Sequence, residues 1–306
     1  MKLLKLVPDN TNIKFLRLSN AFYAMSALLM AASIFLVFTK GLNLGVDFVG
    51  GQMIRVTFTQ SAEAPVAELR TQVGELGYGE PIIQQFGKPN EISVRMKLPE
   101  GSEADASLAD AMARKITATI KAEHPDARID GVDSVSGKVS GELFKTGMQA
   151  LFAAMLAISV YIWVRFEWQF GVGALLSLLH DVTLTLGLFA LTQMEFDLNI
   201  VAAILTLIGY SLNDTIVVYD RIRENLKKYR RMPMAELLDL SVNETLSRTI
   251  VTTLSLLITL VALLVLGPNV IFGFTAAITL GIFVGTYSSI YMAAPILMWL
   301  KVTSNS

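Results

Sequence analysis

The chain has 306 residues, of which 53% are hydrophobic and only 17% are charged, and it contains no cysteine. Without cysteine there can be no disulfide, thiolate metal site or cysteine nucleophile, and the formal net charge of −1 gives no basis for nucleic-acid binding. A low charged fraction together with several uncharged runs of about 20 residues predicts a polytopic α-helical membrane protein.

The first long apolar run, residues 18–39, directly follows a basic N-terminal segment that contains Lys14 and Arg17. A cleaved signal peptide also begins with basic residues, but its apolar region is only about 7–15 residues long. This run has 22 residues. We therefore predict a permanent membrane anchor, preceded by a cytoplasmic N-terminus at residues 1–17.

Five further runs are long enough to cross a membrane as helices, which takes about 20 residues. Gly267, Pro268 and Asn269 divide the last uncharged stretch into two spans, because such turn residues end helices. The last five spans form a predicted bundle over residues 144–301. The six predicted spans are residues 18–39, 146–164, 170–191, 198–219, 249–266 and 272–299.

The distribution of Lys and Arg predicts the orientation, because these residues accumulate on the cytoplasmic side of membrane proteins. The N-terminus is basic, and the segment between spans four and five, residues 220–248, carries seven Lys or Arg residues. The loop between spans three and four carries only the acids Glu195 and Asp197. We expect both termini, including the tail at residues 302–306, and the basic loop to be cytoplasmic.

Residues 40–143 would then lie outside, and they are long enough for a small domain with flanking hinges. Apolar and polar residues alternate from residue 52 to 59, a strand pattern that places Ile54, Val56 and Phe58 on one face. The order β-α-β-β-α-β predicts a periplasmic ferredoxin-like α+β domain, with another α+β topology as the alternative. Strands are predicted at residues 52–59, 81–86, 91–97 and 127–135, and helices at 64–76 and 104–123.

Asp214 is the only charged residue in the fourth predicted span. A carboxylate at membrane depth costs about 2.5–3.5 kcal/mol on insertion scales, and such residues commonly mark ion or proton paths. Thr206, Tyr210, Asn213 and Asp214 follow one another at helical spacing, so they share one helix face. We therefore predict that Asp214 handles the transported ion.

In span five, Arg248, Thr252, Ser255 and Thr259 also share one face, which we expect to turn inward with Arg248 as the counter-charge of Asp214. The hydroxyl groups could instead only join helices, and Arg248 could extend to the membrane surface. If Arg248 moves away, the buried acid is expected to take up a proton, and to release it when Arg248 returns.

Span three carries the pair His180 and Asp181 near its middle. This pair either supports the ion path or ties its helix to neighbouring helices, and both interpretations stay open. On span six, Gly281, Gly285 and Ser289 recur every four residues, which predicts close helix packing through small side chains.

Three motifs make the chain resemble the SecF family, the membrane subunits of the bacterial SecDF protein-export factor. The resemblance covers nearly the whole chain, and no motif core departs from the family pattern. The motifs are GVDFVGG at residues 45–51, RFEW at 165–168 followed by His180 and Asp181, and GYSLNDTIVVYDRIREN at 209–225.

The resemblance implies half of an RND-superfamily transporter, in the bacterial inner membrane and paired with SecD. It also implies association with the SecYEG translocon, YajC and a translocating preprotein, and a role in drawing exported proteins to the periplasmic side. Such a subunit is not an enzyme and needs no cofactor beyond a transmembrane proton gradient or, in some bacteria, a Na⁺ gradient.

By the same resemblance, Asp214 matches the family's essential intramembrane acid, Arg248 matches the basic residue placed near it, and Asn213 borders the path. Tyr210, Thr252, Ser255, His180 and Asp181 are possible supporting polar residues. A single carboxylate suits H⁺ or Na⁺, and the neighbouring hydroxyls and Arg248 favour H⁺. No metal site is predicted.

Gly45, Gly50 and Gly51 flank the junction between span one and the outer domain. Glycine permits backbone angles that other residues resist, so these residues form either a tight turn or a hinge that responds to protonation. A small-molecule efflux half-transporter of the RND type is the alternative function, although the outer domain shows no evident pattern of a drug-sized pocket.

Overall fold

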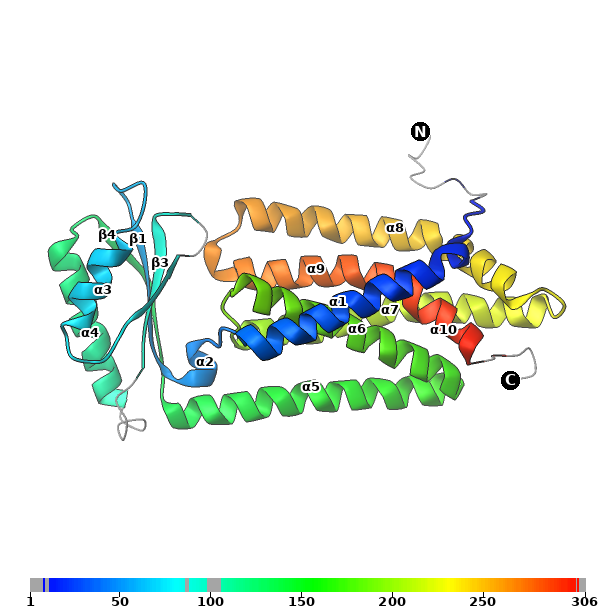
Figure 1. Cartoon of the computed structure of the whole chain (residues 1–306), viewed down its shortest axis with the longest axis horizontal. Coiled ribbons are helices and arrows are strands. Elements are labelled where there is room, and N and C mark those ends of the chain that lie inside the picture. Colours follow the sequence, from blue (N-terminus) through cyan, green and yellow to red (C-terminus); the bar gives the residue numbers. More distant parts are fainter. Residues whose placement is uncertain (1–7, 9–10, 86–87, 98–105, 301, 303–306) are drawn as a thin grey trace. The chain divides into compact units, whose positions relative to one another are not determined.

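The computed structural model describes residues 8, 11–85, 88–97, 106–300 and 302, which belong to two compact units (Figure 1). We call the unit of residues 1–43, 150–194 and 199–306 the helical bundle, and the unit of residues 44–149 and 195–198 the sheet domain. Several predicted segments lie partly outside the described residues, namely the N-terminus 1–17, the strand 81–86, the helix 104–123 and the tail 302–306.

The prediction of six membrane spans is confirmed for the described part of the chain, which has six helical segments long and apolar enough to cross a membrane. Such segments place all backbone hydrogen bonds inside the helix, as the bilayer requires. They are α1 (Ser19–Lys40, preceded by the 3₁₀ turn Phe15–Leu18), α5 (Gly137–Arg165), α6 (Trp168–Thr192), α7 (Leu198–Lys228), α8 (Met234–Leu266), and α9 (Phe272–Ser288) continued by α10 (Ala294–Trp299).

The basic segment 220–248 is mostly helical, so its prediction as a loop was wrong. Helices α7 and α8 extend into it from both sides and leave only residues 229–233 between them. Charged and polar side chains join the two extensions: Arg221 and Asn225 of α7 each donate a hydrogen bond to Glu244 of α8 at 2.7 Å. Helical structure therefore continues past the apolar stretch that the sequence pattern detected.

The sixth span is interrupted by a π-helical turn, Ser289–Ala293, between α9 and α10. Pro295 is the second residue after this turn, and proline cannot donate the regular backbone hydrogen bond to the preceding turn. Two tyrosine hydroxyls from other helices donate to carbonyl oxygens of this turn, Tyr219 of α7 at 3.0 Å and Tyr23 of α1 at 3.2 Å. The irregular turn thus becomes a contact point for three spans.

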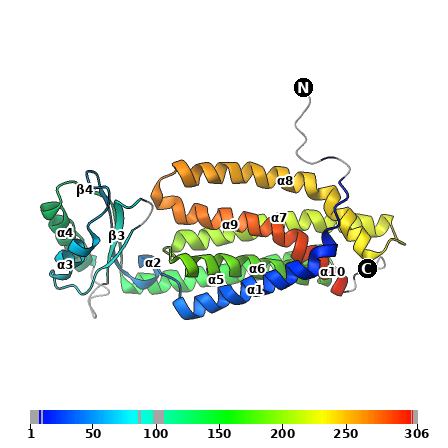
Figure 2. The ribbon, with the colours of Figure 1, turned by 45° about the horizontal axis from the view of Figure 1, so that its top comes forward.

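Helix α9 lies beside both α7 and α8 in the two views of the ribbon (Figures 1 and 2). A Cβ atom on Gly281 would lie 2.3 Å from Leu207 of α7, and one on Gly285 would lie 3.0 Å from Ser211 Cβ. At Gly281 a Cβ atom would force the Leu207 side chain to move, and at Gly285 the contact with Ser211 would be tighter than most real Cβ contacts, so glycine favours this close approach. The predicted small-residue packing of span six is confirmed.

The sheet domain contains one four-stranded antiparallel sheet in the order β2-β3-β1-β4. Its strands and its two longer helices follow one another along the chain as β1-α3-β2-β3-α4-β4, which is the predicted sequence of strands and helices. Their bounds are β1 Gly51–Phe58, α3 Val66–Gly74, β2 Ile82–Gln85, β3 Glu91–Met96, α4 Ala106–Glu123 and β4 Ala127–Val135.

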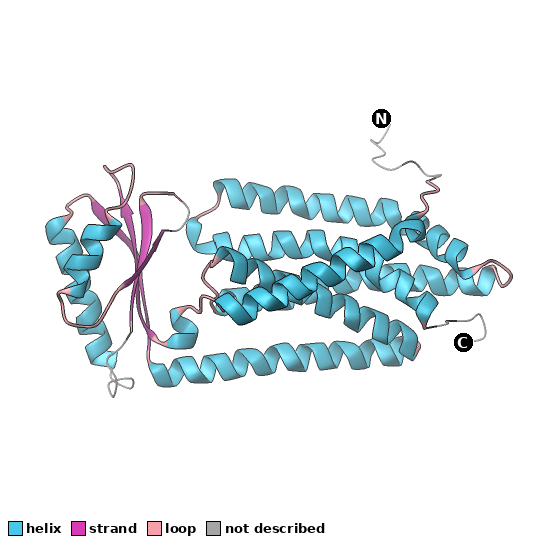
Figure 3. Ribbon diagram, in the orientation of Figure 1, coloured by secondary structure: helices cyan, strands magenta, loops and turns pink. Residues whose placement is uncertain are grey.

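Helices α3 and α4 cover the same face of the sheet (Figure 3). Ile54, Val56 and Phe58 of β1 point into the core between sheet and helices and are 0% exposed. Arg55, between them in the sequence, instead pairs with Asp133 at 2.7 Å. The alternation predicted for β1 is confirmed, and burial of its apolar face stabilises the domain.

A short helix, α2 (Val46–Val49), precedes the sheet and was not predicted. Gly51 begins β1 with φ 118°, and a Cβ atom there would lie 2.3 Å from the carbonyl oxygen of Met96. Only glycine fits at this position. The hinge role of Gly45, Gly50 and Gly51 stays a prediction.

Candidate functional site

Asp214 lies in the buried interior of the helical bundle on α7, with a side chain that is only 6% exposed. The hydroxyl of Thr249 on α8 donates a hydrogen bond to Asp214 Oδ1 at 3.0 Å. The other oxygen, Oδ2, is buried and has no hydrogen-bond partner among the described residues. A buried polar atom without a partner is costly, so Oδ2 is the atom at which a proton or an additional donor would be most stabilising.

Arg248 is exposed and forms no ion pair with Asp214 in the described structure. Its charge still acts on the carboxyl group electrostatically. The direct partner is the next residue, Thr249, which the sequence analysis did not single out as a site residue. Thr249 and Thr253 recur at four-residue spacing, and this second row of hydroxyl residues is the sequence feature that could have identified Thr249 as a site residue.

The face of α8 that was predicted to turn inward is exposed on this chain, which corrects the prediction. The buried hydroxyls lie on the adjacent face, where Thr249 reaches Asp214 and Thr253 is hydrogen bonded to Thr286 of α9 at 2.9 Å. Tyr210 of α7 also reaches Thr253, at 3.4 Å. The exposed side chains are Arg248, Thr252, Ser255 and Thr259.

On α7, Asn213 and Thr206 are exposed as well, although they share a predicted face with Asp214. Thr206 satisfies its hydroxyl by donating to the Ala202 carbonyl of its own helix at 2.8 Å. Exposed amide and guanidinium groups are unfavourable against lipid hydrocarbon. We call Asn213, Arg248 and Ser255 the exposed polar group, and its chemistry suits contact with protein or water better than contact with lipid.

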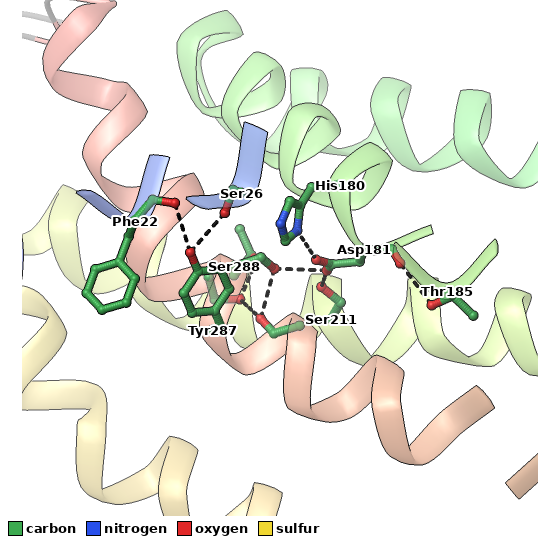
Figure 4. A network of polar contacts seen from close by, with 11 residues as sticks. Phe22, Ser26, His180, Asp181, Thr185, Ser211, Tyr287 and Ser288 are labelled. Atoms are coloured by element: carbon green, nitrogen blue, oxygen red, sulfur yellow. Dashed lines mark hydrogen bonds and ion pairs between the residues drawn. The ribbon is translucent and has the colours of Figure 1, made fainter. Parts of the chain in front are cut away.

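The pair His180 and Asp181 on α6 is completely buried, at 0% exposure for each residue (Figure 4). His180 Nδ1 lies 3.0 Å from Asp181 Oδ1. Asp181 Oδ2 accepts hydrogen bonds from Ser211 of α7 at 2.5 Å and from Ser288 of α9 at 2.9 Å. The carboxyl group therefore joins three spans, as one of the two sequence interpretations expected.

One face of α7 is fixed by three hydrogen bonds spaced four residues apart. Ser211 donates to Asp181, the Thr215 hydroxyl lies 2.8 Å from that of Ser289, and Tyr219 donates to the π turn. Asp214 lies on the same helix and contacts α8 instead. The face that includes Ser211 thus sets the rotation of α7, and with it the direction of Asp214.

In the sheet domain, Glu195 lies against Gly45, where a Cβ atom would come within 2.9 Å of Glu195 Oε1. That oxygen is buried and has no hydrogen-bond partner in the described residues. Burial raises the pKa of Glu195 above its usual value, and the nearby charge of Arg95 opposes the shift. In the prediction from sequence, Glu195 served only to indicate the orientation of the chain in the membrane.

Residues 115–303 match the family described as "Protein export membrane protein SecD/SecF, C-terminal", and residues 35–62 match the SecD/SecF GG motif. The first match spans more than half of the chain. The chain belongs to the SecD/SecF family of protein-export membrane proteins. The GG-motif match contains all three glycines of the predicted hinge.

Similar proteins carry the name protein translocase subunit SecF. The protein from Cereibacter sphaeroides is 46% identical over 302 residues, covering 98% of this chain and 93% of the relative. The protein from Rickettsia felis is 41% identical over 295 residues, covering 96% and 94%. The sequence-based assignment to this family is confirmed.

Among solved structures, the chain is similar to SecDF from Thermus thermophilus, a translocon-associated membrane protein, with a TM-score of 0.85 and 34% identity. The match covers 95% of this chain but 39% of the SecDF chain. A second SecDF structure, in a super-membrane-facing form, matches with a TM-score of 0.69 and 35% identity. The two SecDF structures thus share this fold to different degrees.

Proposed function

We propose that this chain is the SecF-type subunit of a SecDF complex, which uses the proton-motive force to promote preprotein export through SecYEG. It is a transport subunit rather than an enzyme. The complex lies in the bacterial inner membrane and includes YajC as a further partner. The family match supports protein export over the small-molecule efflux alternative.

The observation that carries the proposed mechanism is the environment of Asp214. One carboxyl oxygen is held by Thr249 at 3.0 Å, and the other is buried without a described partner. In a medium of low dielectric constant, an ionised carboxylate with a missing donor is strongly disfavoured relative to its protonated form. Asp214 would therefore bind a proton when the site is closed, and release it when water or a cation approaches Oδ2.

Arg248 is the cation that this chain offers for that release. It directly precedes Thr249 on α8 and is exposed on this chain. Approach of its guanidinium to Oδ2 would stabilise the ionised carboxylate by a charge-assisted hydrogen bond. The coupling ion is H⁺ in this proposal, and a Na⁺-driven complex is the variant to be tested beside it.

The exposed polar group of Asn213, Arg248 and Ser255 supports a SecD partner. These side chains are unfavourable against lipid. The matching SecDF chain is more than twice as long as the part of it that this chain covers, so the remainder of that chain is available as the counterpart of a partner. SecD would bury this face of α7 and α8 and complete a hydrated path along it. Asn213 would then border the path beside Asp214.

We also propose that both termini are cytoplasmic and that the sheet domain is periplasmic. The concentration of Lys and Arg at the α7–α8 connection supports this orientation. The strand order β2-β3-β1-β4, with a strand–helix–strand unit split by an inserted strand, supports a ferredoxin-like assignment. In that place the domain is available to preproteins that emerge from the translocon.

The test is Asp214→Asn in cells, scored by accumulation of a secreted precursor. Asp220→Asn is a matched control, because Asp220 is an exposed carboxylate on the same helix and its ion pair with Arg165, at 3.6 Å, is itself exposed and therefore weak. We expect Asp214→Asn to block the stimulation of export while the amount of assembled complex stays normal, and Asp220→Asn to export as wild type does. Normal export with Asp214→Asn would refute the proposed coupling.

A further inference from the structure

We propose that Asp47 is a positioning residue for α7, the helix that carries Asp214, and that it holds the first residue of α7 within the sheet domain in a contact that stays closed during transport. Asp47 belongs to the short helix α2, and its Oδ2 accepts a hydrogen bond from the backbone N–H of Leu198 at 3.0 Å. The importance of this contact for export rests on the function proposed above, but the contact itself does not.

The hydrogen bond from Leu198 is a helix cap. Leu198 is the first residue of α7, so its N–H has no acceptor inside the helix. A carboxylate that accepts this N–H satisfies it, and the negative charge also suits the positive end of the helix dipole. Such caps are commonly supplied by the residue directly before the helix, whereas Asp47 is 151 positions away in the sequence. The cap therefore ties α7 to α2.

The residues directly before α7 are attached to α2 as well. The backbone N–H of Gly45 donates to the Phe196 carbonyl at 2.9 Å, and Leu44 forms a parallel β-bridge with Phe196. The Phe196 side chain is 2% exposed and lies against Phe48 of α2, with ring centroids 6.0 Å apart. Opening this contact would expose both aromatic rings and break the hydrogen bonds of Gly45 and Leu198, which favours a contact that stays closed.

Gly45 supports the attachment independently, because its backbone conformation does not require glycine. Its φ of −70° and ψ of 172° are open to any residue. A Cβ atom there would lie 3.2 Å from Asp197 Cβ and 2.9 Å from Glu195 Oε1. At this position glycine therefore serves the close approach of residues 195–197, which agrees with a fixed attachment.

The attachment bears on the ion site through α7 itself. Residues Glu195–Leu198 belong to the sheet domain, and α7 continues from Leu198 as one uninterrupted helix. Asp214 lies about 24 Å further along its axis, at about 1.5 Å per residue. Ser211 sets the rotation of α7 in the bundle, and Asp47 holds the beginning of the same helix. A load on the sheet domain would thus reach Asp214 along one stiff element.

The first experiment tests the cap in the full chain with its partner subunit in lipid nanodiscs. Asp47→Ala removes the acceptor, whereas the matched variant Asp47→Asn keeps a side-chain oxygen that caps helices about as well as aspartate does. Hydrogen exchange of the first turn of α7 should be about fivefold faster in Asp47→Ala, as for loss of one cap, and unchanged in Asp47→Asn. Exchange of β1 should be unchanged in both variants, which separates positioning from damage to the sheet domain.

The same two variants are then scored for export in cells, with the amount of assembled complex measured alongside. We expect Asp47→Ala to lose export stimulation at a normal amount of complex, and Asp47→Asn to restore it. Wild-type export and exchange in Asp47→Ala would overturn the proposal. An equal loss in both variants would also overturn it, because the hydrogen bond would then not be what matters.

The second experiment tests whether the contact stays closed. The chain contains no cysteine, so Gly45→Cys combined with Asp197→Cys introduces a single pair. The separation of 3.2 Å between their Cβ positions is close to the about 3.5–4.5 Å found in disulfides. We expect a disulfide to form in the assembled complex, and export to be equal with the disulfide intact and after its reduction.

Failure of the disulfide to form would overturn the attachment, and loss of export that recovers on reduction would show that the contact has to open. The two single-cysteine variants are the controls, and if either already reduces export, the comparison of Asp47→Ala with Asp47→Asn decides. Disulfide formation and exchange of α7 do not depend on ion coupling. They therefore succeed or fail separately from the export test of Asp214→Asn.

Discussion

Replacement of Ser211 by alanine removes the hydrogen bond that joins α7 to Asp181. The bond is 2.5 Å long and completely buried. Hydrogen bonds to charged groups contribute about 1.5–3 kcal/mol in soluble proteins, whereas those between membrane helices average about 0.6 kcal/mol and reach about 1.7 kcal/mol. The membrane scale applies here, because the unfolded chain also finds partners within the bilayer. For a short bond to a carboxylate we expect the upper part of that range, about 1–1.7 kcal/mol.

The assay is reversible unfolding of the purified complex in mixed micelles, with Ser247→Ala as the control because Ser247 is an exposed serine of α8 outside the exposed polar group. Ser288 donates to the same carboxyl oxygen as Ser211, at 2.9 Å. The double variant should therefore deviate from additivity by about 0.5 kcal/mol or more. If Ser211→Ala behaves like Ser247→Ala, Asp181 does not hold α7, and the explanation of how α7 is positioned fails.

Three further perturbations test the packing and the sheet domain. Gly187→Ala should destabilise the bundle by about 1–3 kcal/mol, because the new Cβ would lie 2.4 Å from Ser33 Cβ of α1 and 3.0 Å from its Cα. The control Gly209→Ala has open space at its Cβ and should gain up to about 1 kcal/mol of helix propensity. Equal unfolding midpoints for the two variants would contradict the α1–α6 contact. Below the usual glutamate pKa, Glu195 is protonated in both the folded and the unfolded chain. As the pH rises, the carboxyl group ionises first in the unfolded chain, because burial raises the pKa of Glu195 in the folded chain. The stability of the sheet domain should therefore fall with rising pH until the pH passes the raised folded-state pKa. Hydrogen exchange of β1 should show that fall in the wild type and lose it in Glu195→Gln, and an identical pH profile would count against the burial of this carboxyl. Ile116→Ala should destabilise the sheet domain by about 2–5 kcal/mol, since Ile116 is 0% exposed in its core, and wild-type protection of β1 from exchange would show that the core is assigned wrongly.

The sequence was sufficient for the features that follow from local pattern. Apolar length predicted six spans, and alternation placed Ile54 and Val56 in the core of the sheet domain. The small residues at positions 281 and 285 predicted close packing correctly, because the absence of a side chain has the same consequence wherever the neighbouring helix lies. Each of these predictions depends on one element alone.

Features that depend on which helix faces which were harder to predict. The spacing of Arg248 and Ser255 identified a polar stripe on α8 but not its direction, and the buried stripe is the neighbouring one with Thr249. Hydroxyl residues occur on both stripes, so composition cannot distinguish a face that contacts α7 from a face that would contact another chain. Asp214 could be singled out because a lone carboxylate in an apolar span is unusual in any orientation, and its role in ion handling stays a prediction.

Secondary structure beyond the apolar runs was also missed. Helices α7 and α8 continue through the basic segment because side-chain pairs such as Arg221 and Glu244 satisfy their charges outside the apolar stretch. The short helix α2 consists of only Val46–Val49, which is too few residues to produce a periodic signal. Its place depends on contacts made by Gly45 with Phe196, far away in the sequence.

The central claim is that Asp214 carries the coupling proton, and the most direct measurement is proton flux through the complex itself. The full complex is reconstituted in vesicles with a pH-sensitive dye inside, a proton gradient is imposed, and wild type is compared with Asp214→Asn and the control Asp220→Asn. We predict proton entry for wild type and Asp220→Asn, and none above the rate of empty vesicles for Asp214→Asn. Undiminished proton entry with Asp214→Asn would contradict the account.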